Sequence, residues 1–494
     1  MPVRTPLMRA TPVPVKPRGP APARRTPAPW AWRALLALGL AALASACHPT
    51  HGQNNTFVRS DTTNSDFVQQ QIAVGIRPFD VAIAPRTFCP APNYLAPNLA
   101  VANFSGNSVT YLTNDGKGNF AATVLPTGLA PMRVQFADLD RSSAANCSYD
   151  LVVMHTANDS GTGPGISVLL TNDNVNWGSA FYPLPSLPEQ VSVVDMDGDG
   201  YPDLVASIPA SGLMAIFLNK GRSPGPAGTF SDPILIFLGA QPTRFVVTDY
   251  TGAPLDLDAD RSSLGLPCTD IAVLVPTLNQ VYVMESWSAS QACAPYKGGT
   301  FAIAPYDLDK NPFAIVAADL NGDGAPELIT TSHDGPVVGI LRNSVIPPVT
   351  FSIFPGTPLP QYKAPQRMAV APFSGTPPGI AIAHPDDKTI SYVAYLGGSN
   401  FGLSSYELDA TPFDLAPGAF TPSGYLDLVV TESAKRMAYI GHGDGTGGFT
   451  FSQIGFDNGI GSAAVARLRP GKAQDIVMVQ PLNNTLMILY NVNP

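Results

Sequence analysis

The sequence carries little charge for its length. Asp, Glu, Lys and Arg together make up 13% of the 494 residues, whereas Pro (51) and Gly (44) are abundant. Apolar residues reach 45%, which is more than a disordered chain contains. Because this much Pro and Gly would interrupt long helices, the composition predicts an all-β chain of many short strands joined by turns.

Residues and motifs that are typical of enzymes are also scarce. The chain has six His residues. It lacks a His-Glu-x-x-His motif, and it lacks a phosphate-binding glycine loop followed by a helical pattern. Since none of these catalytic motifs is present, we predict that the protein is not an enzyme.

The N-terminal segment differs from the rest of the chain. Residues 1–46 contain seven basic residues and no acidic one, and they end in an apolar run from Ala34 to Ala46. A basic region, a short apolar region and small residues in this order are typical of a secretory signal peptide. The run is shorter than the roughly 20 residues that a transmembrane helix needs. We therefore predict a signal peptide over residues 1–46.

Cys47 directly follows three small residues, Ala44, Ser45 and Ala46. This order resembles the bacterial lipobox, which implies that Cys47 becomes a lipidated N-terminus. The alternative is an ordinary signal peptide that is cut near Ala46. In lipoproteins an Asp after the Cys retains the protein at the inner membrane, and His48 stands there instead. The resemblance thus implies an outer-membrane or cell-surface position, a flexible tether over residues 47–65, and lipid as the sole membrane link.

The exported part of the chain is strongly acidic. Without the signal peptide, 21 basic residues remain against 37 acidic ones, which gives a formal net charge of −16. Nucleic-acid binding needs clustered Lys and Arg, so we expect no nucleic-acid partner. The acidity suits a protein that binds divalent cations, although solubility alone would also account for it.

A repeat of about fifty residues runs through the rest of the chain. Seven copies begin with a Pro that has an apolar residue three positions later: Pro78, Pro131, Pro188, Pro242, Pro312, Pro365 and Pro412. An eighth copy, without the Pro, begins near Ala463. Each copy contains a short strand with small residues, a loop, a second strand, a third strand, and a fourth strand. In the clearest copies an acid opens the second strand. Four short strands per repeat predict a β-propeller over residues 66–494.

The ends of the repeat region predict how the propeller closes. The eighth copy stops after its third strand, at Tyr490, while residues 67–73 form a strand that belongs to no copy. We expect this N-terminal strand to complete the last blade, because closure removes the open sheet edges. The prediction is eight blades, with seven as the alternative if one weak copy is irregular. A β-solenoid would need shorter repeats with a steady period.

Two Asp-rich loops join first and second strands and have the spacing of a metal site. In one loop the oxygen ligands would be the side chains of Asp195, Asp197, Asp199 and Asp203 and the backbone carbonyl of Tyr201. In the other they would be the side chains of Asp319, Asn321, Asp323 and Glu327 and the backbone carbonyl of Ala325. Gly at two intervening positions lets the chain turn tightly around an ion, and an all-oxygen shell suits calcium. An EF-hand is excluded, because Ala206 and Thr330 stand where it needs Glu. The alternative is a metal-free Asp/Gly turn, in which the crowded carboxylates would repel one another.

These loops, the strands that follow them and the Gly-rich turns resemble the FG-GAP/VCBS repeats of integrin-α-type propellers, over about residues 66–494. The resemblance implies two structural Ca²⁺ ions, one in each loop. Two other loops depart from the pattern, because Arg141 and Arg261 interrupt the acidic series. We expect an Arg there to serve as the charge partner in place of an ion.

Four further cysteines suggest two disulfides in an exported protein. Three pairings are open from the sequence alone. The propeller scheme favours Cys89 with Cys147 and Cys268 with Cys293, and the alternative is free buried thiols.

The prediction for function is a binding or interaction module at the cell envelope, with an unknown protein or glycan as partner. A purely structural envelope component is a further reading. The alternative is a propeller enzyme, a lyase or glycosidase, that uses a polar ring on the face opposite the Asp-rich loops. This ring would consist of Asn103, His155, His333, His384, Glu432 and Gln480.

Overall fold

The computed structural model describes residues 57–58, 66–85, 96–143, 148–156, 163–222, 226–248, 269–287, 300–334, 338–343, 351–353, 365–375, 377–397, 400–421, 423–432 and 434–493. The chain divides into two units, residues 1–54 and 55–494, and every described residue belongs to the second unit. The predicted signal peptide and Cys47 therefore lie outside the described residues. Within the described part, no helix is long and apolar enough to cross a membrane.

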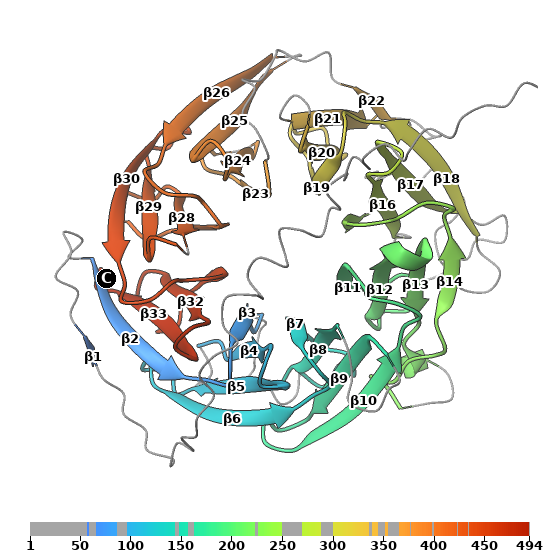
Figure 1. Cartoon of the computed structure of the whole chain (residues 1–494), viewed down its shortest axis with the longest axis horizontal. Coiled ribbons are helices and arrows are strands. Elements are labelled where there is room, and N and C mark those ends of the chain that lie inside the picture. Colours follow the sequence, from blue (N-terminus) through green and yellow to red (C-terminus); the bar gives the residue numbers. More distant parts are fainter. Residues whose placement is uncertain are drawn as a thin grey trace, which may run out of the picture. The chain divides into compact units, whose positions relative to one another are not determined.

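The described strands form eight antiparallel sheets, numbered here as blades 1 to 8 (Figure 1). Blade 1 contains β3 (Pro78–Ile83), β4 (Leu99–Asn103), β5 (Ser108–Asn114) and β6 (Phe120–Pro126). Blade 2 contains β7 (Pro131–Ala137), β8 (Asp150–His155), β9 (Gly165–Thr171) and β10 (Trp177–Pro183). Blade 3 contains β11 (Gln190–Val194), β12 (Asp203–Ile208), β13 (Leu213–Phe217) and β14 (Ile234–Phe237), with the 3-10 turns η1 (Pro209–Ser211) and η2 (Lys220–Arg222). Blade 4 contains β15 (Phe245–Thr248), β16 (Asp270–Val275), β17 (Gln280–Trp287) and β18 (Thr300–Asp307).

The remaining blades repeat the same order of four strands. Blade 5 contains β19 (Pro312–Ala318), β20 (Glu327–Ser332), β21 (Val338–Asn343) and β22 (Phe351–Ile353). Blade 6 contains β23 (Arg367–Ala371), β24 (Gly379–His384), β25 (Thr389–Gly397) and β26 (Asn400–Glu407). Blade 7 contains β27 (Asp414–Gly418), β28 (Asp427–Glu432), β29 (Met437–Gly443) and β30 (Phe449–Gly455). Blade 8 combines β31 (Ala463–Ala466), β32 (Asp475–Gln480) and β33 (Thr485–Asn491) with β2 (Phe67–Ala73) and the short β1 (Phe57–Val58).

The N-terminal strand closes the ring, as the sequence predicts. β2 pairs antiparallel with β33 from Phe67↔Asn491 to Ala73↔Thr485, and Figure 1 shows this blue strand beside the red end of the chain. β1 then pairs with the outer side of β2. The eight-blade prediction is therefore confirmed, and the seven-blade alternative is wrong.

The hydrophobic core consists of layers between neighbouring blades. Each of the eight clusters of buried residues joins two adjacent blades: Leu151 and Val153 of blade 2 pack on blade 1, whereas Val152 and Met154 pack on blade 3. The second strands are buried on both faces because their alternating side chains serve both layers. Blade-to-blade burial, at roughly 25 cal/mol per Å² of apolar surface, thus holds the ring together.

Polar side chains of the innermost strands add a second set of links between blades. Asp80 Oδ2 of blade 1 accepts from Val134 N of blade 2 at 3.1 Å. Gln190 of blade 3 exchanges two hydrogen bonds with the backbone of Phe245 in blade 4, at 2.8 and 3.1 Å. Since such bonds fix the register of one blade against the next, they specify the ring geometry in addition to the apolar layers.

Candidate metal centre

The first Asp-rich loop connects β11 to β12 in blade 3. Val194 and Asp203 are paired across the two strands, so the sheet closes the base of the loop. Gly198 and Gly200 have φ of 69° and 86°, a left-handed conformation that favours glycine. The strands and the two glycines therefore hold residues 195–202 in a tight turn.

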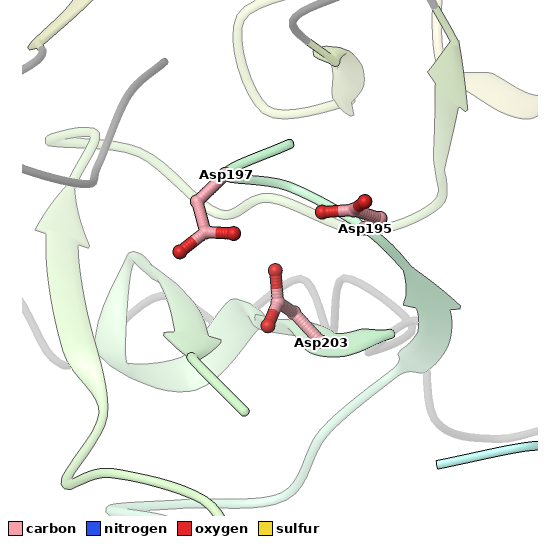
Figure 2. Close-up of side chains that lie close together, drawn as sticks. All are labelled: Asp195, Asp197 and Asp203. Atoms are coloured by element: carbon pink, nitrogen blue, oxygen red, sulfur yellow. The ribbon is translucent and has the colours of Figure 1, made fainter. Parts of the chain in front are cut away.

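Three carboxylates of this loop lie close together (Figure 2). Asp195, Asp197 and Asp203 each offer one oxygen, and these oxygens all lie within 4.8 Å of one another. Asp197 is 7% exposed and Asp203 only 1% exposed, so water screens little of their repulsion. Among the described residues, this is the one gathering of three acidic, His or Cys side chains with metal-site spacing.

Burial and mutual repulsion disfavour the charged forms of these acids. Burial, followed by the charges of Asp197 and Asp195, raises the pKa of Asp203 to about 8 against its backbone hydrogen bonds. Burial and the charge of Asp199 likewise raise the pKa of Asp195. A cation bound between the carboxylates would reverse both effects, because an opposite charge favours the ionised form.

Backbone donors hold the loop acids in place. Met196 N and Asn219 N each donate to one oxygen of Asp203 at 2.8 Å, which ties the loop and the end of β13 to the start of β12. Gly200 N donates to Asp195 Oδ2 at 2.7 Å. Asp199, predicted as a ligand, is not in the group of three, and its Oδ1 accepts from Tyr201 N at 2.8 Å.

The acid at the start of the second strand recurs in blades without the Asp series. In blade 7, Asp427 accepts from Phe420 N at 2.8 Å and from Gly443 N at 2.9 Å, the same two links that Asp203 makes. This acid is therefore a bridge between strands in itself. What distinguishes blade 3 is the addition of Asp195 and Asp197.

The second Asp-rich loop connects β19 to β20 in blade 5 and repeats the backbone pattern of the first. Gly324 N donates to Asp319 Oδ2 at 2.9 Å and Ala325 N to Asp323 Oδ1 at 3.0 Å. Glu327 accepts from Asn321 Nδ2 at 2.7 Å, and burial raises the pKa of Glu327 to about 7. The two loops thus share one conformation, with Asn321 where blade 3 has Asp197.

Arg141 contacts the neighbouring blade. Its guanidinium carbon lies 4.8 Å from the centre of the Tyr201 ring, and a Cβ on Gly200 would come within 2.6 Å of the guanidinium. Asp138 and Asp140, in the same loop as Arg141, accept instead from Ser143 and Ser142. Arg141 therefore covers the loop of blade 3. The sequence predicts that Arg141 balances the acids of its own loop. The structure shows it on the loop of the next blade, because contacts between loops depend on how neighbouring blades pack.

Several predicted residues lie outside the described part of the chain. These are the loop with Arg261 and the cysteines Cys89, Cys147, Cys268 and Cys293. The two favoured disulfides stay predictions.

The residues of the predicted polar ring are for the most part closed to solvent. Asn103, His155, His384, Glu432 and Gln480 are at most 1% exposed, while His333 lies at the surface. Each belongs to a different blade, at the end of its second strand or just beyond it. Asn103 donates to Ser108 Oγ at 3.1 Å and Glu432 accepts from Ala434 N at 2.8 Å, so these side chains brace their own hairpins. Burial lowers the pKa of His155 and of His384 to about 4, which favours neutral rings.

The polar residues that lie on the innermost strands were not predicted from the sequence. They stand two positions after the repeated Pro, as in Asp80, Arg133, Gln190 and Asp414. Asp80 pairs with Arg133 at 3.2 Å, and Asp414 Oδ2 accepts from Ala463 N at 3.2 Å. A polar residue recurring at this fixed offset was the signal that could have revealed them.

One comparison with known protein families gives a match in blade 3. Residues 187–229 match the family model of the FG-GAP repeat. This match covers blade 3, called the FG-GAP blade from here on, from the start of β11 through the Asp-rich loop and η2. It therefore includes all three gathered acids. No curated protein matches the chain.

Solved structures give distant matches. The chain is similar to BBS1N in its complex with ARL6DN, with 12% identity, a TM-score of 0.43, and coverage of 88% of this chain and 98% of that one. It is also similar to the β-propeller domain of Cps50 (Swd1) from Myceliophteria thermophila, with 8% identity, a TM-score of 0.43, and coverage of 73% and 95%. A protein from Lactobacillus plantarum has 13% identity, a TM-score of 0.41, and coverage of 67% and 88%. At these scores the propeller assignment rests on the strand pairing described above.

Proposed function

We propose that the loop of the FG-GAP blade binds one calcium ion. Asp195, Asp197 and Asp203 would supply carboxylate oxygens, and Asp199 and the Tyr201 carbonyl would complete the shell. The observation that carries this proposal is the gathering of three carboxylate oxygens within 4.8 Å. An all-oxygen donor set without His or Cys suits a hard cation, and a flexible loop with several carboxylates suits calcium better than magnesium.

A second calcium ion would bind in blade 5. Its ligands would be Asp319, Asn321, Asp323, the Ala325 carbonyl and Glu327. The support is the backbone pattern that this loop shares with the FG-GAP blade, in which Gly324 N and Gly200 N donate to the first Asp of each loop. Because Asn321 is neutral, this loop has one negative charge fewer, so we expect it to bind calcium more weakly.

Calorimetric titration of the chelator-treated protein, residues 48–494, tests both sites. We expect two calcium ions per chain and much weaker binding of magnesium. Asp197→Ala should remove the stronger site, because Asp197 is one of the three gathered carboxylates. Asp232→Ala removes an exposed acid of the same blade and should leave both sites intact. A wild-type titration without binding, or one that Asp197→Ala leaves unchanged, contradicts the proposal.

Each ion would act as a structural staple within its blade. In the FG-GAP blade, Asp203 already links the loop to β13 through Met196 and Asn219. A cation on the other carboxylates would fix the rest of the loop to this link. The propeller would then serve as a rigid binding module at the cell envelope, whose partner is a protein or a glycan. The acidity of the exported part and the signal-like segment before Cys47 support this location.

Membrane fractionation of the full chain, expressed in a bacterium, tests the anchor. The wild-type protein should sediment with membranes and incorporate a labelled fatty acid. Cys47→Ser should be released in soluble form, because lipid is the proposed membrane link. Asp232→Ala, which changes an exposed acid of the propeller, is the control and should remain membrane-bound. A Cys47→Ser protein that stays with the membrane and carries label would refute lipidation at Cys47.

A further inference from the structure

The loop of blade 8 makes the same backbone link to its acid as the loop of the FG-GAP blade, but Arg467, Arg469 and Gly471 stand where that loop has Asp195, Asp197 and Asp199. Leu468 N donates to Asp475 Oδ2 at 3.1 Å, just as Met196 N donates to Asp203 Oδ2 at 2.8 Å, and each donor stands seven residues before its acid. In this alignment Arg469 occupies the position of Asp197. A positive side chain therefore stands where the FG-GAP blade has a candidate ligand.

Arg469 is bound to the acid that corresponds to Asp203. Its Nη2 donates to Asp475 Oδ1 at 2.8 Å and to Asn491 O at 2.7 Å. The guanidinium carbon also lies 4.6 Å from the centre of the Tyr490 ring. The Asp475 side chain is fully buried, so this ion pair is shielded from water on the acid side. One cationic group thus joins the loop, the start of β32 and the end of β33.

The two buried acids have opposite electrostatic surroundings. Burial raises the pKa of Asp475, and the hydrogen bond and charge of the Arg469 guanidinium partly offset this rise. Asp203 faces the carboxylates of Asp197 and Asp195, which add to the effect of burial. Blade 8 therefore has within its own loop a positive charge that the loop of the FG-GAP blade lacks.

These contacts lie at the junction where the ring closes. Asn491 N donates to Asp475 Oδ1 at 2.9 Å, and Asn491 Nδ2 donates to Phe420 O of blade 7 at 2.7 Å. On the other side, the Tyr490 hydroxyl donates to Gly118 O of blade 1. The ion pair of Arg469 and Asp475 is therefore connected to both neighbouring blades.

We propose that Arg469 is the fixed cation of blade 8, taking the place that a calcium ion takes in the FG-GAP blade, so that closure of the ring does not depend on metal. The comparison with calcium rests on the proposed function, whereas the ion pair itself does not. Loss of metal would then loosen blades 3 and 5 and leave the closing blade intact.

Thermal unfolding of Arg469→Met, which keeps the apolar stem and removes the charge, is the first test. Removing Arg469 leaves Asp475 buried without its charge partner, so we expect the melting temperature to fall by roughly 3–5 °C. The fall should be the same in saturating calcium and in chelator. Lys472→Met removes an exposed charge from the same loop and should change nothing. An Arg469→Met protein as stable as Lys472→Met overturns the proposal.

The double variant Arg467→Asp and Arg469→Asp tests whether this loop accepts an ion, because it places acids at the positions of Asp195 and Asp197. With Asp475 they would form a group of three carboxylates, so calcium should raise the melting temperature of this variant by more than it raises that of the wild type. If the variant is unfolded in chelator, the corresponding result is that calcium restores a cooperative transition. No gain beyond the wild type overturns the equivalence with a metal site. If calcium has no effect on the wild type while Arg469→Met still loses stability, the calcium sites fail and the fixed cation stands.

Discussion

A chain that starts at Val74, and so lacks β2, is expected to lose its cooperative unfolding transition and to aggregate. β2 supplies the fourth strand of blade 8 and pairs with β33 along its whole length. Its Phe67 packs against blade 7 and its Ile72 against blade 1, and both are at most 6% exposed. Loss of these two side chains alone costs about 5–10 kcal/mol, comparable with the whole stability of a typical domain.

The open edge adds to this loss. Without β2, the backbone groups of β33 would face water at an unpaired edge, which promotes association between chains. The matched control is a chain that starts at Asp66, which lacks the same N-terminal residues but keeps β2. Circular dichroism melting and light scattering of the two chains decide the question. Equal melting temperatures would contradict the role of β2 as the closing strand.

The repeat made most of the fold predictable from the sequence. A Pro at or just before the first strand marks seven of the eight blades, and an acid opens the second strand in most of them. In blade 5, for example, the structure begins β19 at Pro312 and β20 at Glu327. The missing fourth strand of the last copy identified residues 67–73 as the closing strand. These signals are local in sequence, and each repeats several times.

The site was predictable where the ligands belong to one turn. Asp195, Asp197 and Asp203 are brought together because the strand pair closes the loop between them. Asp199, also predicted as a ligand, is not in the group, and its carboxylate accepts a hydrogen bond from Tyr201 N two residues later, a local bond typical of Asp in turns.

Contacts between blades could not be predicted in the same way. Arg141 reaches Tyr201 of the next blade, and Asp80 caps Val134 of the next inner strand. Both contacts depend on how far one sheet is rotated against its neighbour, which a repeat pattern does not specify. For the same reason five of the six polar residues near the ends of the second strands, expected at an open face, are buried.

Calcium is expected to raise the melting temperature of residues 48–494 by about 5 °C over that in chelator. A site at 100 times its dissociation constant contributes about 2.7 kcal/mol, and two sites in a chain of this length give roughly that shift. The physical reason is the group of carboxylates at Asp195, Asp197 and Asp203, which an ion neutralises in the folded state alone. The effect is absent from the unfolded chain, where the acids are far apart.

The most direct test of the account is this melting experiment on the wild type and on the double variant Asp197→Ala and Asp323→Ala. The account predicts that calcium stabilises the wild type and leaves the melting temperature of the double variant unchanged. Asp232→Ala, the control, should respond to calcium as the wild type does. A wild-type protein that calcium and chelator leave equally stable, and that contains no metal by elemental analysis, would contradict the central claim that these loops are calcium sites.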